Sequence, residues 1–170
     1  MHPKADAKER IKFQKKIDRY KKQKKVIVYS DESGFEHDMP RRYGYSLKGT
    51  PCYGTHDWHA KGRINVIGAL SGKNLLTVCL FEGTINADVF YAWVTQDLLP
   101  QLPPHSVFVL DNATFHKRSD SREALEQAGH IVEFLPPYSP DLNPIEHKWA
   151  ELKSLRRSLR CTVQDLFSYL

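Results

Sequence analysis

The feature that most constrains the fold is a run of apolar residues, V-F-V-L, which follows Ser106 and ends at Leu110. A strand without alternating polar and apolar residues is buried on both faces, which is typical of parallel sheets covered by helices on each side. A chain of 170 residues is long enough for one such domain with a substantial core, whereas two full domains would be cramped. We therefore expect one α/β domain built around this strand.

The other strands and helices follow from the spacing of apolar residues. A β-branched and aromatic run from Val26 to Tyr29 predicts a first strand that ends near Asp31, closed by a turn at Ser33-Gly34. Further strands are expected at residues 63–70, 75–81, 106–110 and 131–135. Helices are expected at residues 86–98, 120–128 and 144–159, and a last helix after Thr162. Pro100 ends the first of these helices and Gly129 ends the second. Residues 36–62 are expected to form a loop with a short strand at residues 43–47. This order predicts a mixed five-stranded sheet with helices on both faces.

The positive charge of the chain is concentrated at its beginning. Residues 1–25 contain eleven basic and three acidic side chains, a net charge of +8, whereas the rest of the chain has a net charge of −3. Within this segment Phe13, Ile17 and Tyr20 recur at helical spacing, so we expect a basic helical arm or linker whose apolar stripe packs on something. A basic arm before a slightly acidic domain at residues 26–170 indicates a polyanionic partner, nucleic acid first, although a solvated charged helix would look the same.

Several classes of protein are disfavoured by what the sequence contains. The longest apolar run is too short to span a bilayer, and the basic beginning is followed by no hydrophobic stretch typical of a signal peptide. We therefore expect a cytoplasmic protein that makes no contact with membranes. Three widely spaced cysteines argue against a disulfide framework and against a structural zinc site. A zinc site formed by Cys52, His56 and His59 is disfavoured because their spacing lacks the paired pattern of zinc modules.

Two of the expected strands end in an aspartate. Asp31 and Asp111 both stand at carboxyl ends, where open α/β sheets place their functional crevice. If these strands are parallel neighbours, both side chains can reach one metal cluster. Each aspartate also has a purely structural interpretation, since Asp is a good turn former and Asp111-Asn112 could close an Asx turn.

A third carboxylate, Glu146, lies in the first turn of the last long helix. Asn143 is a good N-cap and Pro144 suits the first helical position, which puts Glu146 at the third position, where a carboxylate reaches back to the cap or favours the positive end of the helix dipole. Capping alone therefore explains the glutamate. It does not explain the stiff approach to the helix, which contains Pro136, Pro137, Pro140 and Pro144.

The faces of this helix predict how it packs. An apolar stripe should bury against the sheet, namely Ile145, Trp149, Leu152, Leu155 and Leu159. Glu146 lies beside that stripe in a row that continues with Ala150, Lys153 and Arg157. A carboxylate followed by two cations suits a site that binds a phosphodiester and follows its backbone, although an exposed basic row is equally typical of a helix without such a role.

Three motifs carry a resemblance to a known family. They are S-D-E-S-G-F around Asp31, V-L-D-N-A-T-F-H-K around Asp111 and P-P-Y-S-P-D-L-N-P-I-E-H-K-W around Glu146, with 34 residues between Asp111 and Glu146. Together they closely resemble the catalytic domain of the mariner-like transposases, in the bacterial insertion-sequence branch of that superfamily. The resemblance covers nearly the whole chain, from about Val26 to about Leu159, and the third motif is highly specific by itself.

This resemblance implies a ribonuclease-H-like fold in which Asp31, Asp111 and Glu146 bind two Mg²⁺ ions, with Mn²⁺ as a substitute. Two such ions, three carboxylates and the scissile phosphate together form a neutral cluster. The implied reaction is metal-dependent cleavage of DNA at the ends of an insertion sequence, in which water attacks first and the freed 3′-hydroxyl then attacks a target strand. The implied enzyme is an endonuclease and strand transferase.

Further residues match the motifs or follow from the basic row of the last helix. We predict that the following residues shape the site or contact DNA: Asn112, His116, Asn143, His147, Lys153 and Arg157. Glu32 is not expected to face the metals together with Asp31, because side chains alternate along a strand and the resemblance selects Asp31.

The chain departs from the family in one respect. Family members of usual length carry a helix-turn-helix region before the catalytic domain, and here only the basic arm of residues 1–25 stands in that place. A transposase split over two reading frames, with a separately encoded helix-turn-helix partner, or a truncated copy would explain this. The implied partners are double-stranded DNA, at the element ends and the target, and a second copy of the chain in a homodimer on DNA, in the bacterial cytosol or nucleoid. A noncatalytic DNA-binding remnant and another ribonuclease-H-like nuclease are the alternatives.

Overall fold

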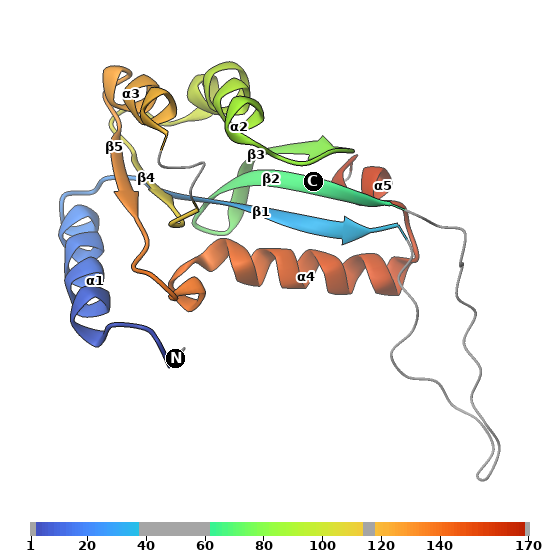
Figure 1. Cartoon of the computed structure of the whole chain (residues 1–170), viewed down its shortest axis with the longest axis horizontal. Coiled ribbons are helices and arrows are strands. Elements are labelled where there is room, and N and C mark those ends of the chain that lie inside the picture. Colours follow the sequence, from blue (N-terminus) through green and yellow to red (C-terminus); the bar gives the residue numbers. More distant parts are fainter. Residues whose placement is uncertain (1–2, 38–61, 114–117, 169–170) are drawn as a thin grey trace, which may run out of the picture.

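The computed structural model describes residues 3–37, 62–113 and 118–168, and Figure 1 shows their arrangement. Some predicted features lie outside these ranges, namely the short strand at residues 43–47, the disfavoured zinc ligands Cys52, His56 and His59, and the candidate site residue His116.

One mixed sheet organises the described residues. Its strands are β1 (Ile27–Glu36), β2 (Arg63–Ser71), β3 (Asn74–Phe81), β4 (Val107–Leu110) and β5 (Ile131–Phe134). They lie in the order β3-β2-β1-β4-β5. β1, β2 and β3 pair antiparallel, whereas β1, β4 and β5 pair parallel. The predicted five-stranded mixed sheet is confirmed, and β4 is buried along its whole length as the apolar run indicates.

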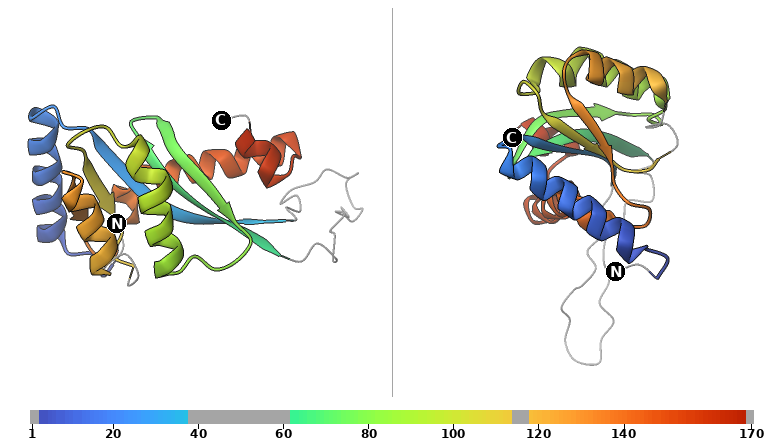
Figure 2. Two further views of the ribbon diagram at one scale, coloured as in Figure 1. Left: turned by 90° about the horizontal axis from the view of Figure 1, so that it is seen from above. Right: turned by 90° about the vertical axis from the view of Figure 1, so that its left-hand side faces the viewer.

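Helices cover both faces of this sheet. They are α1 (Ala7–Lys22), α2 (Ala87–Trp93), α3 (Ser119–Gln127), α4 (Pro144–Leu159) and α5 (Val163–Ser168). Figure 2 shows α2 and α3 on one side of the sheet and α1 and α4 on the other. After α2 the chain continues through a π-helical turn at Val94–Leu98 and a 3₁₀ turn at Leu99–Gln101, so the helical stretch runs one residue past Pro100. None of the described helices is long and apolar enough to cross a membrane.

The first strand differs from its prediction. The turn expected at Ser33-Gly34 does not form, and β1 continues to Glu36, which pairs with Arg63. The strand continues because β2 offers hydrogen-bonding partners along its whole length and because Phe35 is buried against Trp149 of α4. Long-range pairing therefore outweighs the turn propensity of Ser-Gly.

The apolar stripe of α4 is also shorter than predicted. Ile145, Trp149 and Leu152 are buried, but Leu155 and Leu159 are 41% and 58% exposed. Arg156 is buried in place of Leu155, and its guanidinium donates hydrogen bonds to the backbone carbonyls of Glu36, His37 and Cys161. A buried cation with such partners ties the last turns of α4 to the end of β1.

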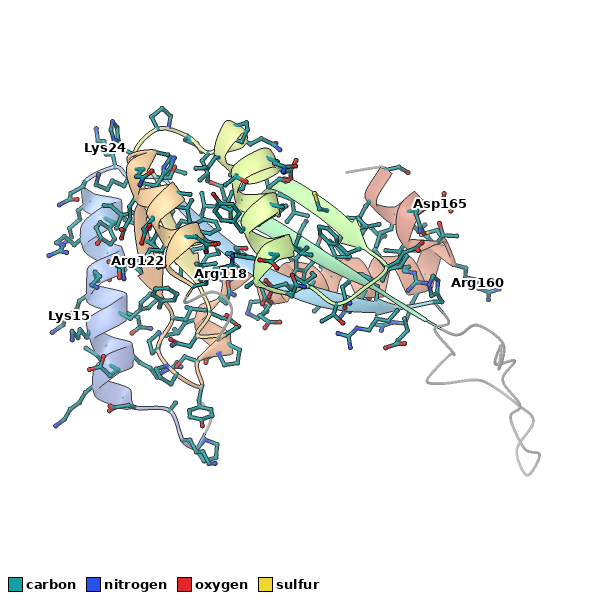
Figure 3. The ribbon with its side chains drawn as sticks, turned by 45° about the horizontal axis from the view of Figure 1, so that its top comes forward. Lys15, Lys24, Arg118, Arg122, Arg160 and Asp165 are labelled. Carbon is teal, nitrogen blue, oxygen red and sulfur yellow. The ribbon has the colours of Figure 1, made fainter. Side chains whose placement is uncertain are left out.

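The basic arm is confirmed as an amphipathic helix that packs on the sheet. Phe13, Ile17 and Tyr20 are buried against the side chains of β4 and the residue that follows β5, namely Val107, Val109 and Leu135. Lys16 and the Tyr20 hydroxyl both bind the carboxylate of Glu133 on β5. The outer side of the arm remains basic, and Figure 3 shows Lys15 and Lys24 directed away from the sheet.

A further contact joins α1 to the proline-rich segment before α4. Both terminal nitrogens of Arg10 donate to the carboxylate of Asp141, at 2.9 and 2.6 Å. Asp141 belongs to the 3₁₀ turn Pro140–Leu142, which directly precedes α4. Because a two-bond Arg–carboxylate pair fixes orientation as well as distance, α1 holds the segment from which α4 starts.

Candidate active site

The sheet register brings the two aspartates together. In the parallel pairing of β1 and β4, Tyr29 lies opposite Val109, so the residues two positions further on are Asp31 and Asp111. Asp31 lies within β1, beyond the last residue that pairs with β4, and Asp111 directly follows β4. The two aspartates thus come from parallel neighbouring strands as expected, but Asp31 stands just past the end of the pairing with β4 and not at the carboxyl end of β1.

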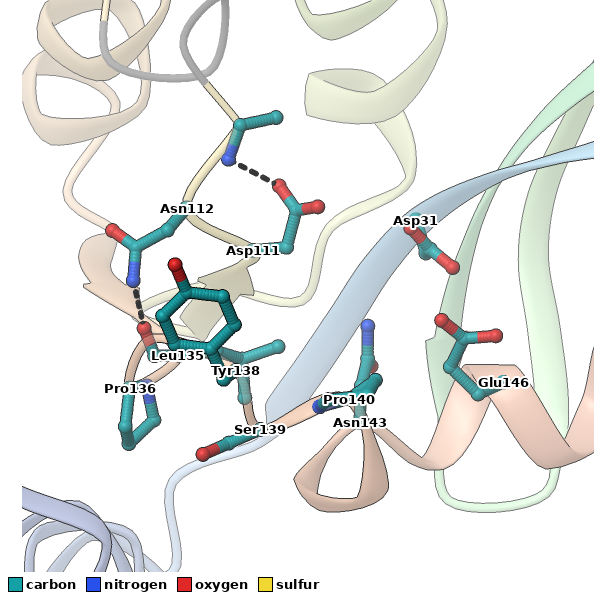
Figure 4. A pocket seen from close by; sticks show the side chains of 11 residues that line it. Asp31, Asp111, Asn112, Leu135, Pro136, Tyr138, Ser139, Pro140, Asn143 and Glu146 are labelled. Atoms are coloured by element: carbon teal, nitrogen blue, oxygen red, sulfur yellow. Dashed lines mark hydrogen bonds between the residues drawn. The ribbon is translucent and has the colours of Figure 1, made fainter. Parts of the chain in front are cut away.

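Glu146 reaches the same place because α4 packs closely under β1 and β2. Asp31 pairs across the sheet with Gly68, where a Cβ would lie 2.7 Å from the ring of Trp149. The absence of a side chain at Gly68 thus lets Trp149 lie against the sheet and brings the start of α4 close to it. Figure 4 shows the carboxylates of Asp31 and Glu146 facing each other.

All three carboxylates line one open cavity of about 210 Å³. The other lining residues come from the segment after β4 and from the proline-rich segment before α4, and they include Asn112, Tyr138 and Asn143. Asp111 lies across the cavity from the other two carboxylates, and its Oδ1 accepts a hydrogen bond from the backbone N–H of Ala113 at 2.8 Å. The Asx turn predicted as an alternative role for Asp111 thus coexists with its place in the cavity.

The electrostatics of the cavity are dominated by like charges. Burial raises the pKa of Asp31 to about 8, and the neighbouring carboxylates of Glu146, Glu32 and Asp111 contribute in that order after burial. Asp31 is only 7% exposed. A carboxyl group whose pKa is raised by burial and by neighbouring carboxylates is typical of sites that hold a cation or transfer a proton.

The raised pKa of Asp31 predicts how stability depends on pH when metal ions are removed. An unfolded aspartate has a pKa of about 3.9, so between about pH 4 and pH 8 the folded chain holds a proton that the unfolded chain has lost. The contribution of Asp31 to the free energy of unfolding is therefore fully present below about pH 4 and is lost as the pH rises toward 8. We expect Asp31→Asn to exceed the wild type in free energy of unfolding at pH 8, by on the order of a few kcal/mol, and to differ little at pH 4.5. Urea unfolding with a chelator over this range measures the difference, and a constant difference would contradict the assignment.

The start of α4 corrects the capping prediction. Asn143 occupies the N-cap position, but its side chain accepts no hydrogen bond from the helix. The turn is closed by the backbone instead, since the N–H of Asn143 donates to Pro140 and the N–H of Glu146 donates to the Asn143 carbonyl. The Asn143 side chain is buried and lines the cavity, and within the described parts of the chain its Oδ1 has no hydrogen-bond partner.

The chemistry of these side chains fits a hard divalent cation. Carboxylate and amide oxygens are the ligands that Mg²⁺ prefers, and a cation between Asp31 and Glu146 would relieve their repulsion. In the described ranges, no three His, Cys, Asp or Glu side chains lie close enough together to hold one ion jointly. Asp111, turned toward Ala113, is the carboxylate that lies apart.

Only some of the other predicted residues lie at the cavity. Asn112 lines the cavity and donates a hydrogen bond to the carbonyl of Leu135. Lys153 is half-buried, and burial lowers its pKa, as does Arg63, whereas Glu146 and Asp31 raise it. Lys153 thus lies near the carboxylates, while His147 and Arg157 are exposed residues that do not line the cavity.

The prediction missed Tyr138, which lines the cavity and is 53% exposed. Its backbone has a φ of 54°, a conformation that non-glycine residues adopt at a cost and that is frequent at functional sites. The signal in the sequence is an aromatic residue flanked by Pro137 and Pro140, in a segment whose freedom the prolines restrict.

Comparison with known families identifies the family of the chain. A family model of DDE superfamily endonucleases matches residues 26–165. The chain belongs to this family. The matched range includes β1, β4 and the start of α4, the three elements that carry the carboxylates.

Individual proteins that resemble this chain are consistent with the family match. The Tc3 transposable-element transposase of Caenorhabditis elegans is 29% identical over 133 residues, which cover 74% of this chain and 40% of that protein. The structure of the Mos1 transposase paired-end complex with the left transposon end matches with a TM-score of 0.70 at 22% sequence identity. The matched region is 87% of this chain and 47% of the Mos1 chain. The structure of the Mos1 mariner paired-end complex with Mn matches with a TM-score of 0.68 at 24% sequence identity. The matched region is 86% of this chain and 48% of the Mos1 chain.

These findings confirm the prediction of a mariner-like DDE transposase catalytic domain with a ribonuclease-H-like fold. The chain spans less than half the length of these relatives. Its assignment to the bacterial branch stays a prediction.

Proposed function

We propose that this chain is the part of a transposase that cuts double-stranded DNA at the ends of a mobile element and joins the freed 3′-hydroxyl to a target strand. The observation that carries the proposal is the meeting of three carboxylates, from β1, the end of β4 and the start of α4, around one cavity. The catalytic residues are Asp31, Asp111 and Glu146.

Two Mg²⁺ ions, or Mn²⁺ in their place, are the proposed cofactors, and the same three carboxylates are their proposed ligands. The donor oxygens of the cavity support this assignment, as does the existence of Mos1 mariner paired-end complexes with Mg and with Mn. Bound in such a site, divalent cations stabilise the attacking and the leaving oxygen of an in-line displacement at phosphorus.

The chain itself contributes position and charge. The β1–β4 register brings Asp31 and Asp111 to one cavity, and the packing of Trp149 against Gly68 brings Glu146 to the side of Asp31. Asn112 anchors the segment after Asp111 to the end of β5, through the carbonyl of Leu135. Preorganised ligands of this kind reduce the reorganisation needed when substrate and cations bind.

The proposed partners are the DNA at the element ends, the target DNA and a second copy of the chain. The basic outer side of α1 supports the first two, as does the transposon end in the Mos1 complex. A separately encoded helix-turn-helix protein would supply sequence recognition, with residues 26–170 as the catalytic domain and residues 1–25 as the arm beside it. Asn112, His116, Asn143, His147, Lys153 and Arg157 remain proposed DNA contacts, and the proposed location is the bacterial cytosol or nucleoid.

A cleavage assay tests this function. The substrate is a duplex made from the inverted repeats that flank the gene, incubated with the chain and Mg²⁺ or Mn²⁺. We expect nicks at the element end that disappear with Asp111→Asn, because loss of one ligand charge weakens the cation site. Equal nicking by wild type and variant would defeat the assignment, and salt-dependent DNA binding without metal-dependent nicking would identify a noncatalytic DNA-binding remnant.

A further inference from the structure

A glycine in β1 makes room for an arginine from the neighbouring strand. Gly34 and Arg63 lie on the same face of the sheet, because Arg63 pairs with Glu36, two residues from Gly34. A Cβ at Gly34 would lie 1.7 Å from Nε of Arg63 and 2.0 Å from its Cζ and Nη2. The guanidinium thus occupies the place of a side chain at Gly34, which means that Arg63 crosses β1 from the β2 side.

The strand that Arg63 crosses has an edge without a strand partner in the described part of the chain. β4 pairs with β1 only from Ile27 to Tyr29, whereas β1 continues to Glu36, as Figure 1 shows. Because β2 lies on the other side, a side chain that crosses β1 from β2 is directed to this edge. The edge begins next to Asp31, the proposed catalytic residue of β1.

A second cation reaches the same stretch of β1 from the opposite face. Nζ of Lys153 on α4 lies 5.2 Å from the centre of the Phe35 ring, and Phe35 faces α4 while its neighbour Gly34 faces away. Arg63 and Lys153 are close enough that the arginine disfavours the charge on the lysine. Among the described residues, neither forms an ion pair with a carboxylate.

Two cations that lie near each other, and that form no direct ion pair within the described ranges, favour an anion between them at this edge. We propose that Arg63 and Lys153 bind one phosphate of the DNA strand next to the scissile position, along the edge of β1 at residues 32–36, and that Gly34 seats Arg63 for this purpose. The proposal rests on the proposed function, and it adds Arg63 and Gly34 as positioning residues. A phosphodiester fits because it is singly charged and presents two oxygens, one for each cation.

Gly34→Ala gives a sharp test because it changes no charge. The contact that it creates is with the far end of a flexible side chain, so the fold should tolerate it while the guanidinium is displaced. Binding is measured on a duplex of the element end by fluorescence anisotropy over a salt series, in an Asp111→Asn background without divalent metal. The measured affinity then tests phosphate binding at the edge of β1 even if the proposed cleavage activity is disproved. Thermal unfolding of each variant checks the fold.

We expect Arg63→Gln to weaken binding about 3- to 10-fold and to reduce the slope of log affinity against log salt by about 1. Gly34→Ala should lower affinity by a similar factor, and Gly34→Ala combined with Arg63→Gln should bind no more weakly than Arg63→Gln alone. Arg122→Gln is the matched control, because Arg122 is an exposed arginine on α3 already paired with Glu126, and it should bind as the parent does.

Two results would overturn the proposal. If Arg63→Gln binds like Arg122→Gln, the edge of β1 does not take a phosphate. If Arg63→Gln weakens binding but a folded Gly34→Ala does not, Gly34 has no part in seating the arginine. If Gly34→Ala does not fold, the Arg63→Gln and Lys153→Gln pair decides instead, since two cations on one phosphate should show non-additive losses and independent ones should not.

Discussion

Replacing Glu146 by Gln should reduce metal-dependent cleavage of an element end by more than about 100-fold and leave the fold intact. Substitutions of residues that merely orient metal ligands already cost about 10- to 100-fold, and Glu146 is itself a proposed ligand that faces Asp31 across the cavity. Stability should change by less than about 1 kcal/mol, because the first turn of α4 is closed by backbone hydrogen bonds and the helix dipole contributes only about 0.3–1 kcal/mol. Nicking assays and urea unfolding of the same preparation measure both effects.

Glu151→Gln is the matched control for this experiment. Glu151 lies on the same helix, is exposed and pairs with Lys148, so its substitution removes the same charge away from the cavity. It should cleave at the wild-type rate. A Glu146→Gln chain that cleaves normally but loses several kcal/mol of stability would show that the glutamate serves the helix and not the reaction.

Removing residues 1–25 should prevent cooperative folding of the remainder. Phe13, Ile17 and Tyr20 cover Val107, Val109 and Leu135, which would otherwise be exposed on the sheet. Phe13→Ala alone should cost about 3–5 kcal/mol, a large part of the 5–15 kcal/mol that typically stabilises a domain. Urea unfolding followed by near-ultraviolet circular dichroism tests both variants.

Ile11→Ala provides the control on the same helix. Ile11 is 52% exposed, so its truncation should change the free energy of unfolding by no more than about 0.5 kcal/mol. A chain of residues 26–170 that unfolds with the midpoint and slope of the full chain would show instead that the arm is separate from the catalytic domain.

The order of strands and helices could be predicted because each has a clear local pattern, and β4 gave the fold class by its continuous apolar run. Features that depend on distant partners could not. The Ser33-Gly34 pair has high turn propensity, and the pairing with β2 and the burial of Phe35 keep it extended. Arg156 is buried in place of Leu155, because carbonyls at the end of β1 and at Cys161 accept its hydrogen bonds.

The candidate site shows the same division. Asp31, Asp111 and Glu146 could be named from motifs that are short in sequence and specific in spacing, and the sheet register together with the packing of α4 places them around one cavity. Asn143 was expected to cap α4, a local role, but lines the cavity because the backbone closes the turn without it. Arg63 was not predicted as a site residue. Its side chain occupies space that is free only because residue 34, on the neighbouring strand β1, is a glycine.

The pairing of Arg10 with Asp141 has a consequence for the spacing of DNA sequences. Because α1 is fixed both to the sheet and to the segment before α4, a DNA-binding module joined to its first residues would not swing freely around the cavity. The start of α1 lies on the cavity side, since Nζ of Lys4, just before the helix, is 5.9 Å from the centre of the Tyr138 ring. In such an assembly the fixed start of α1 would set how far from its recognition sequence the element is cut.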